Sequence, residues 1–74
     1  MRLYFCKKAY YWLLENTPDA IDEINDGLRA DLDYHEIAAK YCGRDAVRGF
    51  MYMLAACYIF VSRVRSEFET LRIQ

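Results

Sequence analysis

The feature that most limits the possible folds is an apolar repeat along the C-terminal third of the chain. Eight apolar residues alternate at intervals of three and four: Val47, Phe50, Leu54, Cys57, Val61, Val64, Phe68 and Leu71. Because an α-helix has 3.6 residues per turn, this spacing places all eight on one side of a helix. We name this set the apolar stripe. A helix over residues 44–72 would be roughly 40 Å long at ~1.5 Å per residue.

The rest of the chain is short relative to such a helix. The chain has 74 residues, of which 55% are hydrophobic. Proteins of this size bury only about 60% of the surface that their unfolded chains expose. We therefore expect a homo-oligomer, a dimer in the first place, whose subunits contact each other through the apolar stripe without Cys57.

The preceding residues also predict helices, because they show neither strand alternation nor a hairpin dipeptide. We expect these helices over residues 2–15, 18–29 and 34–42. Thr17 and Asp33 stand where helix N-caps are expected, and Gly43 stands where a helix ends. Small residues opposite the stripe would let another backbone approach closely; they are Gly49, Ala56, Ser62 and Ser66. The sequence predicts an all-α fold, a single domain over residues 1–74 with three to four helices and one long C-terminal helix.

The first predicted helix and the tyrosines add apolar and aromatic surface. Residues 2–15 carry a second stripe, Phe5, Ala9 and Trp12, so we expect this helix to be covered on more than one side. Seven residues are tyrosines. Tyr11 and Tyr52 lie off the main stripes, and we expect them to be exposed anchors for a partner.

Acidic residues are concentrated in the middle of the chain, although the net charge is only −1. Residues 15–36 contain a single basic residue, Arg29. The acidic residues are Glu15, Asp19, Asp22, Glu23, Asp26, Asp31, Asp33 and Glu36. They predict an acidic helical face that binds a basic protein; a merely solvated face is the alternative interpretation. Nucleic-acid-binding domains are usually basic, so the composition disfavours that class.

A DNA-binding protein is nevertheless the main functional alternative. Residues 33–48 resemble a helix-turn-helix, with an Ile-Ala pair, a glycine in the turn and a valine in the following helix. The resemblance implies a transcription regulator in which Arg44, Arg48 and Tyr52 contact DNA. The sequence departs from the family pattern, because the interval from Ala38 to Val47 is about one residue shorter than usual.

No catalytic or metal-binding signature is present in the sequence. The only histidine is His35, and the cysteines lack the spacing of a zinc site. A calcium loop around Gly27 would place Ile24 where an oxygen ligand is needed. We therefore expect a non-enzymatic protein without a metal or cofactor, in which Cys6 and Cys57 act as small buried hydrophobic residues.

The expected location is the cytoplasm. Residues 50–61 carry no charge, but about twenty apolar residues are needed to span a bilayer, so we expect a core helix. The N-terminal residues lack the pattern of a signal peptide. The preferred hypothesis is a small protein-interaction module. It could inhibit a nucleic-acid-handling protein, its carboxylates standing in for phosphates, by analogy with phage and mobile-element anti-defence proteins.

Overall fold

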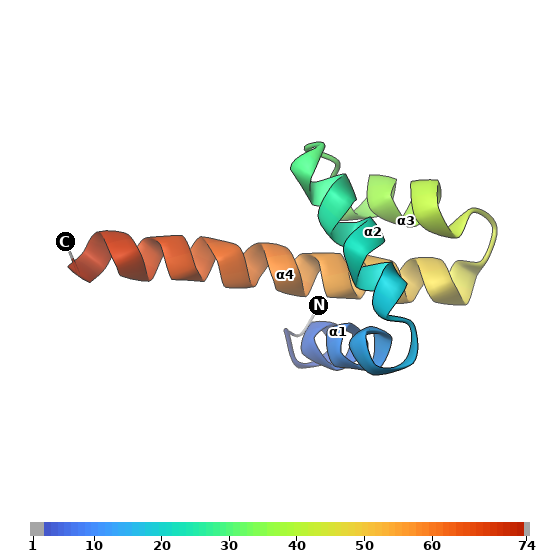
Figure 1. Cartoon of the computed structure of the whole chain (residues 1–74), viewed down its shortest axis with the longest axis horizontal. Helices are drawn as coiled ribbons and strands as arrows, with labels where there is room; N and C mark the ends of the chain where they lie inside the picture. Colours follow the sequence, from blue (N-terminus) through green and yellow to red (C-terminus); the bar gives the residue numbers. More distant parts are fainter. Residues whose placement is uncertain (1–2, 74) are drawn as a thin grey trace.

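The structure is a computed structural model that describes the backbone of residues 3–73 and the side chains of residues 3–67. It contains four helices in these residues, with no strand among them (Figure 1). The helices are α1 (Leu3–Asn16), α2 (Pro18–Arg29), α3 (Tyr34–Cys42) and α4 (Ala46–Ile73). The all-α prediction is confirmed, including the long C-terminal helix.

Local sequence signals account for most of the helix boundaries. α2 and α3 have the predicted bounds, whereas α4 begins at Ala46 rather than at Arg44. The Asp33 carboxylate accepts the backbone N–H of Glu36 at 2.9 Å, as expected of an N-cap. Thr17 occupies the N-cap position of α2, but its hydroxyl makes no capping bond. Its backbone N–H donates to the Leu13 carbonyl at 2.8 Å, so Thr17 still belongs to the last turn of α1.

The two turns around α3 use positive backbone φ angles. Gly43 has φ of 58°, a value that glycine adopts without steric penalty, and it separates α3 from α4. Asp31 has φ of 60° between α2 and α3, and aspartate is among the residues that tolerate this region best. These turns reverse the chain twice, so that both α2 and α3 pack against α4.

α4 is the central element of the bundle. Figure 1 shows α1 on one side of α4, with α2 and α3 covering another side. The main core joins all four helices through Leu13, Ala20, Ile21, Ile24, Ile37, Tyr52, Ala55, Ala56 and Ile59. A second cluster of Cys6, Ala9 and Leu54 joins α1 to α4. Burial of each large aliphatic side chain contributes about 1.5–3 kcal/mol.

Small residues permit close packing at the α3–α4 contact. A Cβ on Gly49 would lie 3.8 Å from the Cβ of Cys42 and 3.9 Å from that of Ala38. Ala56 is fully buried. The prediction of close approach is therefore confirmed at Gly49 and Ala56, while Ser62 and Ser66 are exposed.

α4 runs without interruption for 28 residues, as predicted, and the molecule is 45 Å along its longest axis. Ile59 is the last buried residue of α4 among those with described side chains. We name residues 46–59 the packed half of α4 and residues 60–73 its projecting half. Arg63, near the start of the projecting half, donates a hydrogen bond to Asn25 of α2 at 2.6 Å, and the C-terminal part of this half extends beyond the other three helices (Figure 1).

Candidate protein-interaction surfaces

The apolar stripe lies mainly outside the core of the chain. Val47 is 74% exposed, Phe50 is 56% exposed and Val64 is 40% exposed. Leu54 is buried against α1 and thus serves the fold itself. Cys57 and Val61 are half-buried, while Phe68 and Leu71 lie outside the described side chains. Three of the six stripe residues with described side chains are therefore exposed, and they include both ends of the described stripe.

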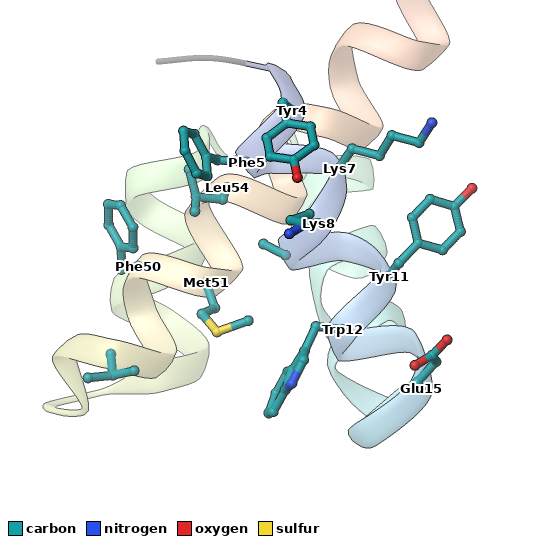
Figure 2. A pocket seen from close by; sticks show the side chains of 12 residues that line it. Tyr4, Phe5, Lys7, Lys8, Tyr11, Trp12, Glu15, Phe50, Met51 and Leu54 are labelled. Carbon is teal, nitrogen blue, oxygen red and sulfur yellow. The ribbon is translucent and has the colours of Figure 1, made fainter.

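An apolar groove of about 820 Å³ lies between α1 and the packed half of α4 (Figure 2). We name it the α1–α4 groove. Its apolar lining includes Phe5, Ala9, Trp12, Val47, Phe50, Met51 and Leu54. Figure 2 shows the Trp12 ring and the Met51 side chain directed into the space between the two helices. Lys7, Lys8 and Glu15 add charged groups to the lining.

The groove corrects the expectation that the chain covers α1 on more than one side. Cys6 and Leu13 are buried, but Phe5 and Trp12 on the second stripe remain half-exposed. The sequence signal for this surface was present in the spacing of Phe5 and Trp12. The spacing could not predict the position of α4, which contacts only one side of α1.

The acidic residues divide into two groups in the structure. Three of them have roles within the fold: Glu23 accepts a hydrogen bond, Asp26 pairs with Arg29 at 3.1 Å, and Asp33 caps α3. The N–H of Glu36, donated to Asp33, holds the pKa of that carboxyl below its ordinary value. The other five acidic residues are all exposed: Glu15, Asp19, Asp22, Asp31 and Glu36.

Tyr52 is buried, so its predicted exposure is wrong. Its side chain is fully inaccessible, and its hydroxyl donates to the Glu23 carboxylate at 2.8 Å. Arg48 donates to the same hydroxyl oxygen at 3.0 Å. Burial, followed by the hydrogen bond to Glu23, raises the pKa of Tyr52. The prediction failed because a residue that lies off the apolar stripe instead faces α2 and α3.

Tyr11 is exposed, as predicted. It contacts Tyr58 of α4, with ring centroids 6.3 Å apart, and a hydrogen bond to Tyr58 raises its pKa. Tyr10 also packs against the Tyr58 ring at 5.2 Å. These rings therefore join α1 to the end of the packed half, and Tyr11 is only in part available to a partner.

The three residues of the DNA-binding alternative have different environments. Arg44 and Arg48 are exposed, whereas Tyr52 is buried. The hydrogen bond to Tyr52 raises the pKa of Arg48 and also fixes the guanidinium against α4. Of these three residues, only Arg44 is exposed and also has no side-chain partner among the described residues.

The cysteines form no disulfide within the described part of the chain. Cys6 is buried as predicted, and Cys57 is half-buried beside it in the α1–α4 cluster. Burial raises the pKa of Cys6, and the neighbouring Cys57 thiol raises it further. No spacing in the sequence predicts that these two residues are neighbours. Residues 3–67 contain no group of three His, Cys, Asp or Glu side chains that could hold a metal ion.

One segment of α4, Ala46–Glu67, is long and apolar enough to cross a membrane by length and composition. The segment is longer than the charge-free run of residues 50–61 because it also includes charged residues, among them Arg48 and Arg63. The same segment includes Tyr52, Ala55 and Ala56, which are fully buried in contact with the other helices. Only 22% of the apolar window in this segment is buried within the structure, so the other helices cover a minor part of it.

No known protein family, curated protein or solved structure matches this chain. The functional argument therefore depends on its own surfaces. Two of them stand out: the apolar stripe with the adjoining groove, and the exposed carboxylates of α2.

Proposed function

We propose that this chain is a non-enzymatic protein-interaction module that forms a homodimer through the apolar stripe of α4. The observation that carries the proposal is the exposure of Val47, Phe50 and Val64 along one side of this helix. Val47 and Val64 are about 25 Å apart at ~1.5 Å per residue. Several exposed apolar side chains on one side of a helix are typical of protein–protein contacts.

A second copy is a suitable partner because Val47, Phe50 and Val64 are exposed along one side of the same helix. Symmetric dimers use the same patch on both subunits, so each stripe would cover the other. The heptad-like spacing of the stripe is the pattern by which α-helices pack side by side. Covering it would also remove from water the apolar surface that the bundle leaves exposed.

Light scattering and analytical ultracentrifugation test the dimer. Val64→Glu places a charge on the stripe, whereas Leu14→Glu places the same charge on α1, away from it. The two residues are matched in exposure, 40% for Val64 and 41% for Leu14. We expect two chains per particle for the wild type and for Leu14→Glu, and one for Val64→Glu. A wild type that remains a single chain at high concentration would overturn the dimer.

The second part of the proposal concerns the acidic surface of α2, which we propose binds a basic protein. Asp19 and Asp22 are exposed and have no partner among the described residues. They are three residues apart on α2, and therefore lie about one turn apart on one side of that helix. Carboxylates one turn apart can occupy positions that phosphates take on a nucleic-acid-binding surface. Inhibition of a nuclease or polymerase, as by anti-defence proteins, is the form of this function that we favour, by analogy.

Co-purification from cells with matched neutralising variants tests the acidic surface. The variant Asp19→Asn/Asp22→Asn removes two carboxylates without internal partners. The control Asp26→Asn/Asp33→Asn changes the net charge equally but removes carboxylates that serve the fold. We expect the first variant to lose a basic partner that the control retains. Equal retention by both would show that the acidic surface is only solvated.

Binding to DNA is measured together with these co-purifications, because the helix-turn-helix alternative is still a prediction. Binding to bulk duplex DNA at low salt, lost in Arg44→Glu, would favour a transcription regulator over an inhibitor. The inhibitor proposal expects no such binding.

A further inference from the structure

The apolar stripe runs through both the α1–α4 groove and the projecting half of α4. Val47, Phe50 and Leu54 of the stripe form the α4 side of the groove. Val61 and Val64 continue the same stripe along the projecting half. Each chain therefore presents an apolar groove at one end of α4 and an apolar helical ridge at the other end.

The two halves of α4 are also equal in length, at 14 residues each of the 28. When two α4 helices pack antiparallel about their midpoints, each projecting half lies beside the packed half of the other copy. In a parallel arrangement the grooves of the two copies would face each other, and neither groove would contain the projecting half of the other copy. In the antiparallel arrangement the two bundles lie at opposite ends of the pair, so that α1, α2 and α3 do not obstruct each other.

We propose, on the basis of the homodimer above, that the projecting half of α4 from each copy occupies the α1–α4 groove of the other copy. The occupant is thus a second copy of this chain, held in a reciprocal antiparallel pair. Each groove then becomes a three-helix contact between α1, α4 and the α4 helix of the second copy.

The apolar area offered by the groove is consistent with a stable dimer. Phe5, Trp12 and Phe50 are each about half-exposed, and an aromatic side chain buries 150–250 Å², so each offers on the order of 100 Å². The three rings supply roughly 600 Å² over two symmetric grooves, about half of the 1,200 Å² typical of the smallest specific interfaces. The stripe and the inserted helices supply further area.

One pair of opposite charges fits the same arrangement. Lys7 and Lys8 line the groove and are exposed, and Glu67 is exposed on the projecting half. In the antiparallel pair, Glu67 of one copy lies level with residues 51–54 of the other, where Lys8 and Leu54 line the groove. The lysine ammonium groups of one subunit thus come near a carboxylate of the second.

A charge-swap experiment tests this pairing. Lys7→Glu/Lys8→Glu places carboxylates against Glu67 in both grooves, and Glu67→Lys places ammonium groups against Lys7 and Lys8. Each variant alone is expected to dimerise at least about tenfold more weakly than the wild type. An equimolar mixture is expected to recover the wild-type affinity, since both grooves of the mixed dimer then pair opposite charges. Lys40→Glu, a charge reversal on the exposed surface of α3, is the control that should leave the dimer unchanged.

The outcomes separate this inference from the dimer itself. A wild-type dimer in which neither variant weakens association, or in which mixing restores nothing, would overturn the reciprocal pairing and leave the homodimer standing. A monomeric wild type would overturn the homodimer. Vesicles containing phosphatidylserine provide a second arm: binding of a monomer that is lost in Lys7→Glu/Lys8→Glu would show that the groove faces lipid, which also overturns the pairing.

Discussion

The packed and projecting halves of α4 belong to one unbroken helix and share one apolar repeat, yet their surroundings differ. Ile59, at the end of the packed half, is 9% exposed, whereas the next residue, Phe60, is 54% exposed. Tyr52, Ala55 and Ala56 of the packed half face the core and are not members of the stripe. The comparison shows that a regular apolar repeat identifies a surface but does not identify what covers it.

Truncation of one apolar residue in each half is the strongest test of this difference. Ile59→Ala is expected to lower the free energy of unfolding by about 3 kcal/mol, because it leaves a cavity in the main core. Val64→Ala is expected to change the stability of the monomer by less than about 0.5 kcal/mol. Chemical denaturation at low protein concentration, where the monomer dominates, measures both values.

Val64→Ala should nevertheless weaken dimerisation, which sedimentation measures separately at higher protein concentration. Equal losses of monomer stability in the two variants would contradict the difference between the two halves of α4. In that case the projecting half would be as tightly packed within one chain as the half that α1, α2 and α3 cover.

Substitutions at two glycines within helices test how closely the helices pack. A Cβ on Gly27 would lie 2.6 Å from Ile37 Cγ1 and 3.3 Å from Tyr41 Cε2, while one on Gly49 would make only ordinary contacts. Gly27→Ala is therefore expected to destabilise the fold by up to about 2 kcal/mol, because overpacking outweighs the gain in helix propensity. Gly49→Ala is expected to stabilise it by about 0.5–1 kcal/mol. Thermal unfolding measures both, and a gain in stability for Gly27→Ala would contradict the close α2–α3 contact.

The last prediction concerns the hydrogen bonds that tie the packed half to α2. Tyr52→Phe removes the hydroxyl between Glu23 and Arg48 and should destabilise the fold by about 1 kcal/mol. Because the fold raises the pKa of Tyr52 above its ordinary value of 10.0, this tyrosine favours the folded state fully below pH 10. Its contribution should be lost as the pH rises from 10 through the pKa of the folded state.

Denaturation of both proteins across this pH range provides the measurement. The stability difference between wild type and Tyr52→Phe should shrink above pH 10, and the other tyrosines, common to both proteins, cancel in the comparison. A difference that does not change with pH would show that the buried hydroxyl does not titrate as the geometry implies.

Sequence patterns predicted the helices well because their signals are local. Pro18 begins α2, Asp33 caps α3 and Gly43 separates α3 from α4, and each acts within a few residues of its own position. The same patterns predicted the environments of single side chains less well. Tyr52 was expected on the surface, and Trp12 was expected under cover, because exposure depends on which helix lies opposite.

The sequence by itself determined an all-helical chain, the boundaries of α2 and α3, and a long α4 with an apolar side. Only the tertiary structure decided that α1 and α4 leave a groove between them and that Glu23 and Arg48 meet at the Tyr52 hydroxyl. The physical reason is the distance along the chain over which each kind of interaction acts. Helix formation depends on hydrogen bonds and caps within a few residues, whereas burial depends on contacts between segments far apart in the chain.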